Sequence, residues 1–282
     1  MVDWSARSKP SPSRWVKDAI YIAFGLGDAE PVVRYFRTRK SAFRALRDYF
    51  SLMIEEGKRV LCGFDFPFGY PAGFAKQVTE KASALAFWQW LSDNITDADD
   101  NSNNRFAAAR DLNAYFDGIG PFWGCPAALN LEGLPHKGRA CFGTNHPSER
   151  RFVETLVPSA SPVWKLFTTG SVGSQALLGI PIVNRLRKEF DTLAIWPFQD
   201  ITKARIICAE IYPSLFADLV QDRLLKTPEL IKDAVEVSTL AEAFRKHDRA
   251  GNLQAFLDAP YTAPVHVIQE EGWILGVLPK AA

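Results

Sequence analysis

The sequence lacks the features that would place the protein in several large classes. Its four cysteines stand at uneven spacing, which does not suit a disulfide-stapled scaffold. No apolar run approaches the length that spans a bilayer, no secretory signal is visible at the N-terminus, and there is no internal repeat or low-complexity tract. We therefore expect a cytoplasmic protein that does not associate with membranes.

An excess of charge of either sign is also missing. Lys and Arg number 33 against 32 Asp and Glu, a net charge of +1, so no global basic field exists to hold a long nucleic acid. A G-x-S-x-G elbow and a G-x-G-x-x-G run after a strand are absent, so a serine hydrolase and a dinucleotide site have no support. Hydrophobic residues make up 47% of the chain, enough for residues 1–282 to fold as a single domain.

The N-terminal third alternates between strand and helix periodicity. Strands are expected at 1–5, 19–24, 32–36 and 59–64, and a helix at 41–56 with Ser41 as N-cap. Three strands, a helix and a fourth strand form the opening of the ribonuclease H-like sheet, in which the fourth strand lies beside the first. The sequence therefore predicts that Asp3 and Asp65, at the ends of those two strands, lie side by side.

Residues 70–204 form a long intervening region with mainly helical patterns and a segment rich in Gly and Pro. A structureless loop of that length would be improbable, so we expect a large, mainly helical insertion packed against the sheet. A buried strand is expected at 204–211 and a helix at 228–245. The predicted fold is α/β, with a mixed five-stranded sheet and flanking helices.

One acidic residue stands at each of three expected strand ends, and others lie on the late helix. The acids are Asp3, Asp65, Glu210, Asp233 and Glu236. The last two are three residues apart and so share one helix face. Carboxylates that converge on one point can bind Mg²⁺ or Mn²⁺ for phosphoryl transfer, because hard cations take oxygen ligands. Strand ends of an α/β sheet are where such side chains converge.

Four short blocks of the chain resemble one family. They are VDWSA (2–6), GFDFPFGYP (63–71), EIYPS (210–214) and KDAVE (232–236). In this order they are similar to the successive blocks of the family catalogued as domain of unknown function 429, which resembles predicted nucleases of the ribonuclease H-like fold. The resemblance implies that Asp3 is the first-strand metal ligand and Asp233 the helix acid. It also implies that Asp65 and Glu210 are the acids of the fourth and the following strand.

The leading hypothesis is a Mg²⁺- or Mn²⁺-dependent phosphodiesterase or nuclease that acts on a nucleic acid or a small phosphorylated ligand. Asp3, Asp65 and Asp233 would bind the metal with Glu236, and Glu210 would hold or activate water. The alternative is a non-catalytic module of the same fold that binds a nucleotide, a cofactor or a protein through the insertion. Convergence of the carboxylates within reach of one metal would favour catalysis.

A phosphate site is one interpretation of residues 170–175, where GSVGSQ leads into an apolar helix. Gly170, Ser171, Gly173 and Ser174 would offer backbone N–H groups at the helix N-terminus. The run lacks the Lys of a P-loop, and the alternative is a tight turn with an N-cap. Arg105 and Arg151 are expected to face the same cleft and to bind substrate.

Overall fold

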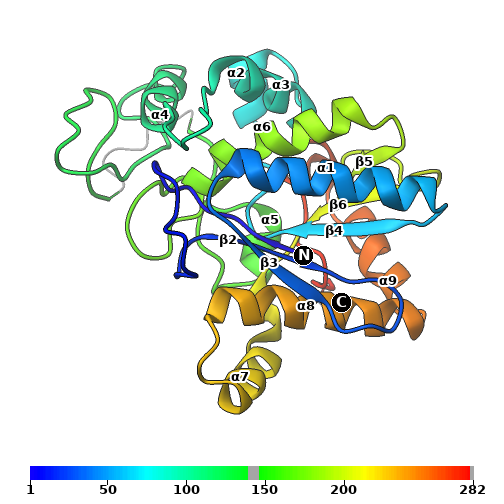
Figure 1. Ribbon diagram of the computed structural model, residues 1–282. Coiled ribbons are helices and arrows are strands. Elements are labelled where there is room, and N and C mark those ends of the chain that lie inside the picture. The colour runs from blue at the N-terminus through cyan, green and yellow to red at the C-terminus, as the bar shows by residue number, and fades with distance from the viewer. Residues whose placement is uncertain (139–145, 280–282) are drawn as a thin grey trace.

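The computed structural model describes residues 1–138 and 146–279. A six-stranded sheet lies at its centre, with helices on both faces (Figure 1). The strands are β1 (Val2–Asp3), β2 (Ile20–Phe24), β3 (Val32–Phe36), β4 (Val60–Phe64), β5 (Leu193–Ile195) and β6 (Ile206–Glu210). Their order across the sheet is β3-β2-β1-β4-β6-β5.

The sheet is mixed, as expected. Strands β3, β2 and β1 form an antiparallel meander, whereas β4 runs parallel to β1, and β6 and β5 continue in the same direction. The predicted adjacency of the first and fourth strands is confirmed, and β6 lies on the other side of β4.

The expected number of five strands was wrong, because β5 adds a sixth at one edge of the sheet. With three residues, β5 is too short to show a period in the sequence. It lies within residues 70–204, so this mainly helical region also contributes to the sheet.

Helices account for most of the remaining regular structure in the described ranges. They are α1 (Arg39–Glu55), α2 (Phe74–Thr79), α3 (Ala84–Asn94), α4 (Arg105–Asn113), α5 (Phe152–Leu156), α6 (Gly173–Glu189), α7 (Ala217–Lys226), α8 (Lys232–Arg249) and α9 (Leu253–Asp258). Short 3₁₀ helices lie at η1 (Pro213–Phe216) and η2 (Ala259–Thr262), and a short π-helix lies at η3 (Val267–Glu271). None of the helices in residues 1–138 and 146–279 has the length and apolar character needed to cross a membrane.

Two helix boundaries differ from the expectation. Helix α1 begins earlier than expected because Thr38, rather than Ser41, is its N-cap, and Ser41 completes a capping box with Thr38. Helix α8 begins at Lys232 and not near 228, because Thr227 closes the preceding helix α7.

The sheet separates two apolar cores. Helices α1 and α6 cover one face, where Leu46 and Ile180 pack with Phe64. Helix α8 covers the other face, where Val237 packs with Tyr21, and Figure 1 shows these helices on opposite sides of the strands. Because successive side chains of a strand point to opposite faces, the position of an acid along its strand decides which core it lies beside.

Candidate functional site

The ends of β1 and β4 bring two aspartates together. Val2 is the register partner of Phe64, so Asp3 and Asp65, one residue further along, lie side by side on the same face. The N–H of Trp4 donates to Oδ1 of Asp65 at 2.7 Å, and the two carboxyl groups are hydrogen-bonded to each other. Both side chains are half-buried.

Helix α8 supplies two more acids to the same face. Asp233 lies in its first turn, and Glu236 lies three residues further on. The helix packs on β1 and β2 through apolar residues that include Val237 and Leu240. Positions 233, 236, 237 and 240 share one helix face, so both carboxylates are directed toward the strand ends. We call Asp3, Asp65, Asp233 and Glu236 the carboxylate cluster.

Two contacts offset part of the negative charge of the cluster. Oδ2 of Asp233 accepts a hydrogen bond from the backbone N–H of Asp18 at 2.7 Å. Nζ of Lys232 lies 3.1 Å from Oε1 of Glu236. The N-terminal end of α8 adds a favourable dipole for nearby anions.

Burial raises the pKa of all four acids. The pKa of Asp3 lies well above its usual range because the group is buried and because the other three acids repel its charge. Burial raises the pKa of Asp65 to about 7, although hydrogen bonds to its carboxylate act in the opposite direction. Burial likewise raises the pKa of Asp233 and of Glu236. The cluster therefore retains protons near neutral pH when no cation compensates it.

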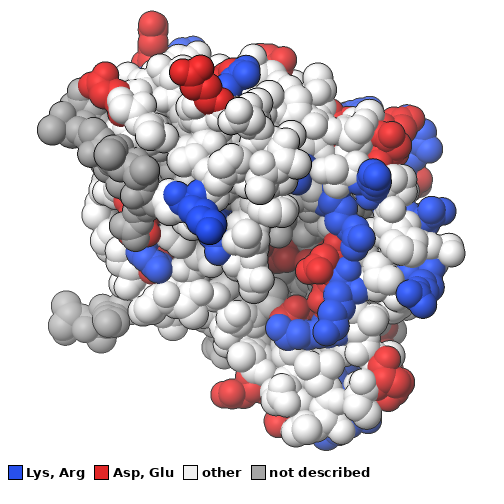
Figure 2. Space-filling model, turned by 90° about the vertical axis from the view of Figure 1, so that its left-hand side faces the viewer, with Lys and Arg blue, Asp and Glu red and all other residues white. Residues whose placement is uncertain are grey.

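The cluster lies at the carboxyl-terminal edge of the parallel strands. Figure 1 shows β4 running toward the side on which α8 begins, and β1 is parallel to β4. Figure 2 views the molecule from that side and shows acidic side chains set back in a hollow, with Lys and Arg side chains beside it. The four acids of the cluster are half-buried and not fully covered, so a ligand can reach them from solvent.

The structure does not bring Glu210 to the cluster. Phe64 and Glu210 are register partners on β4 and β6, so their side chains share a face, and that of Asp65 points to the other. Phe64 belongs to the core beneath α1 and α6. A difference of one residue along a strand reverses the face, and the expected role of Glu210 in activating water has no geometric support.

Glu210 instead belongs to a buried ion-pair network with Arg151 and Glu154, which we call the Arg151 network. Nη1 and Nη2 of Arg151 donate to the two oxygens of Glu210 at 2.7 and 2.6 Å, and its Nε donates to Glu154 at 2.7 Å. Phe68 N–H donates to Glu210 at 3.0 Å. Burial alone would lower the pKa of Arg151, but the two carboxylates raise it above its usual value. With its guanidinium buried and occupied, Arg151 is unsuited to the predicted substrate role.

Residues 170–175 form a turn and the start of α6. Gly170 adopts a φ of 74° within this turn. Ser171 and Gly173 donate their N–H groups to carbonyls of the preceding loop, at 3.1 and 2.9 Å. A Cβ on Gly173 would lie 2.3 Å from the carbonyl oxygen of Val163. Close packing against the chain's own backbone explains this glycine, and the contacts favour the tight turn over the phosphate site.

The remaining predicted substrate residues, Ser174 and Arg105, contact each other. Nε of Arg105 donates to Oγ of Ser174 at 3.0 Å, and its Nη1 donates to Ser8 and Asn103 at 2.9 and 2.8 Å. Burial lowers the pKa of Arg105 to about 10. Arg105 therefore links the start of α6 to the loop after β1, and it is not presented to solvent.

The carboxylate cluster has the donor chemistry of a hard-cation site, because all its donors are carboxylate oxygens. As they stand, no three His, Cys, Asp or Glu side chains within residues 1–138 and 146–279 form a group that could hold a metal ion. The carboxyl groups of Asp3 and Asp65 share a hydrogen bond, and a cation that binds between them would have to replace it.

Sequence reasoning did not identify two residues beside the cluster. Lys232 precedes Glu236 by four positions on α8, and this spacing is a usable signal for an ion pair. Asp18 has a φ of 57°, and its N–H reaches Asp233 across 215 positions. Nothing in the sequence marks that contact. Comparisons of the chain with known proteins found no matching family model, curated protein or solved structure.

Proposed function

We propose that the protein is a divalent-metal-dependent phosphodiesterase of the nuclease type, built on a ribonuclease H-like fold. The observation that carries the proposal is the carboxylate cluster. Four half-buried acids from three separate segments lie at the carboxyl-terminal edge of the sheet, where Asp65, Asp233 and Glu236 are near enough to Asp3 to raise its pKa. Buried carboxylates are costly unless they are paired or bind a metal, and strongly shifted pKa values concentrate at functional sites.

The strand order supports the proposed fold. An antiparallel meander of three strands is followed by α1 and by β4 at the side of β1, which is the arrangement that the sequence predicts for this fold. The blocks that resemble the family of domain of unknown function 429 also carry Asp3, Asp65 and Asp233. All three belong to the cluster.

Asp3, Asp65 and Asp233 would hold Mg²⁺ or Mn²⁺, and Glu236 would remain free to act on water. When bound, such a cation polarises a phosphoryl oxygen and offsets the charge of the transition state. Glu236, whose pKa burial raises, takes the role that the sequence predicted for Glu210, that of accepting a proton from the attacking water. Lys232, next to it and largely exposed, orients a phosphate oxygen.

One observation favours the alternative, a non-catalytic binding module. The Arg151 network occupies Glu210, so one of the four predicted catalytic acids does not converge with the others. Binding of a phosphorylated ligand without hydrolysis would support this alternative.

The experiment is a hydrolysis assay with bis(p-nitrophenyl) phosphate and with a short labelled oligonucleotide, in Mg²⁺, Mn²⁺ or EDTA. The wild type should hydrolyse a substrate only with metal, and Asp65→Asn and Asp233→Asn should each lose at least about a hundredfold in rate. Asp48→Asn is the matched control, because Asp48 is an exposed acid paired with Arg47. Hydrolysis in EDTA, or full activity of Asp65→Asn, would refute the proposal.

A further inference from the structure

The loop between β1 and β2, residues 4–19, begins and ends at the carboxylate cluster. It follows Asp3 directly, and near its end the N–H of Asp18 donates to Asp233 at 2.7 Å. Oγ of Ser5 donates to the carbonyl of Asp18 at 2.6 Å, which closes the base of the loop. The loop is therefore fixed beside the cluster.

Trp15 is an aromatic residue on this loop that remains 44% exposed. Its ring stacks on Tyr35, with centroids 6.0 Å apart and an interplanar angle of 20°, and meets Tyr21 edge-on at 5.4 Å. Both tyrosine hydroxyls donate to carbonyls of the loop, at 2.7 and 2.9 Å, so the indole is held in a defined place. Tyr21 is the register partner of Asp3 and lies between the indole and the cluster.

Four cations lie on the same loop, and the stretch 7–17 contains no acid. They are the exposed residues Arg7, Lys9, Arg14 and Lys17. None of them forms an ion pair with a carboxylate in the described part of the chain. The protein as a whole has a net charge of only +1, so this loop is a local concentration of positive charge next to an acidic hollow, and Figure 2 shows basic side chains beside that hollow.

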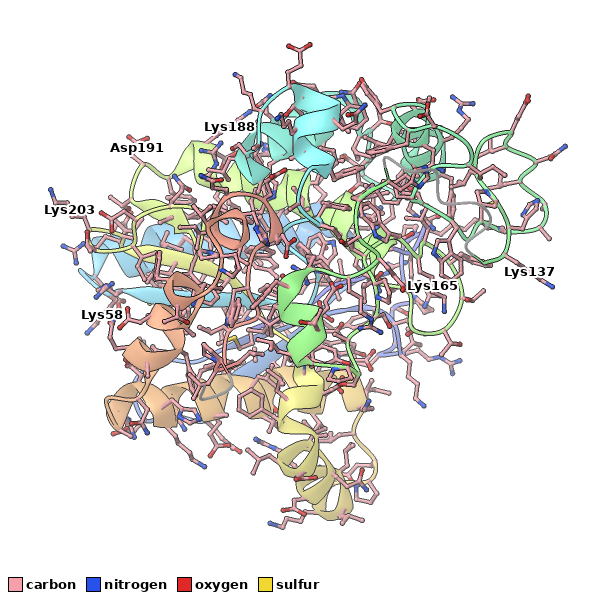
Figure 3. The ribbon with its side chains drawn as sticks, turned by 180° about the vertical axis from the view of Figure 1, so that it is seen from behind. Lys58, Lys137, Lys165, Lys188, Asp191 and Lys203 are labelled. Carbon is pink, nitrogen blue, oxygen red and sulfur yellow. The ribbon has the colours of Figure 1, made fainter. Side chains whose placement is uncertain are left out.

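Four lysines elsewhere in the molecule are not part of the basic loop at residues 4–19. Lys58, Lys188 and Lys203 precede β4, β5 and β6 in the chain, and Figure 3 shows them on the opposite side of the molecule from Lys165. They therefore lie at the amino-terminal edge of the parallel strands, away from the carboxylate cluster. Lys165 is not part of the loop either, because it lies elsewhere in the chain and its Nζ donates to the carbonyl of Thr169 at 2.6 Å.

A rigid aromatic platform with cations around it binds single-stranded nucleic acid, because each unpaired base offers a face for stacking and each phosphate a negative charge. In a duplex the base faces are covered, and a net charge of only +1 gives little general attraction for a duplex backbone. We infer that the protein binds a single-stranded nucleic acid with one base stacked on Trp15, which leaves the adjacent phosphodiester at the carboxylate cluster. The assignment of that phosphodiester rests on the proposed function, whereas the stacking site is defined by its own residues.

The test is fluorescence anisotropy with a labelled oligothymidylate and an abasic oligonucleotide of equal length, in EDTA and at low salt so that no cleavage occurs. Trp15→Ala should weaken binding of the oligothymidylate about tenfold or more and leave binding of the abasic strand unchanged. Trp15→Phe should restore most of the affinity. Tyr261→Ala is the matched control, because Tyr261 is 50% exposed on η2, and it should bind as the wild type does.

If Trp15→Ala weakened binding of both oligonucleotides equally, Trp15 would only support the loop. If the variant bound the oligothymidylate as the wild type does, no base would stack on Trp15. Either result overturns the inference, and so would equal affinity of the wild type for a duplex and for a single strand. Mn²⁺ titration separates the two proposals. Trp15→Ala should bind Mn²⁺ as the wild type does. If the wild type binds no Mn²⁺ but shows Trp15-dependent oligonucleotide binding, the metal-dependent function fails and the stacking site stands.

Discussion

Asp65 and Glu210 lie at the ends of neighbouring strands and point to opposite faces of the sheet, and the groups of acids to which they belong have different surroundings. In the Arg151 network, one guanidinium makes paired hydrogen bonds to Glu210 and a further one to Glu154. In the carboxylate cluster, Asp3 and Asp65 share a hydrogen bond, and Lys232 forms an ion pair with Glu236. Both groups include an acid at the end of a buried strand, so position alone does not indicate a site. The cluster is the candidate because its charge is poorly compensated.

The largest expected effect is on the network. Arg151→Met would leave Glu210 and Glu154 buried without their partner, so the free energy of unfolding should fall by about 3 to 5 kcal/mol. Urea denaturation followed by circular dichroism measures this change. Arg47→Met, which removes the exposed partner of Asp48, should leave the midpoint almost unchanged. A small effect of Arg151→Met would show that Arg151 does not stabilise the buried carboxylates of Glu210 and Glu154.

The cluster should respond in the opposite direction. In EDTA at pH 7.5, Asp65→Asn should raise the free energy of unfolding by about 4 kcal/mol, because it removes a carboxylate that the folded state disfavours. The pKa of Asp65 is about 7 in the folded protein, against an ordinary value of 3.8. The folded state therefore binds the proton more tightly, and the wild type loses this stability as the pH rises from about 4 to about 7.

Thermal unfolding of the wild type and Asp65→Asn at several pH values measures the difference. The advantage of the variant should be absent near pH 4, grow through pH 6 and level off above pH 7. A constant difference across this range would mean that Asp65 is not the group whose proton is retained.

A smaller effect is expected at Gly173, at the start of α6. The Cβ of Gly173→Ala would lie 2.3 Å from one backbone carbonyl oxygen and 2.8 Å from another, so the variant should lose about 1 to 2 kcal/mol of stability through overpacking. Oligonucleotide and Mn²⁺ binding should be unchanged in the fraction that is folded. Loss of phosphate binding without loss of stability would restore the phosphate site at 170–175.

Much of the strand arrangement could be predicted, because apolar runs that end in acids mark β1, β4 and β6, and the order of elements fixes their adjacency. The face of the sheet to which the Glu210 side chain points could not be predicted. It depends on the register of Phe64 with Glu210, which no local pattern encodes. The partner of Glu210, Arg151, lies 59 positions away. The position of Trp15 beside the carboxylate cluster could not be predicted either, because it depends on the path of the loop between β1 and β2.

Calorimetry of Mn²⁺ binding at pH 7 in two buffers of different ionisation enthalpy tests the central claim most directly. The wild type should bind Mn²⁺ and release protons, because the cluster carboxylates must ionise to act as ligands. Asp65→Asn should lose most of the affinity, and Asp48→Asn should keep it. Equal Mn²⁺ binding by the wild type and Asp65→Asn would contradict the account.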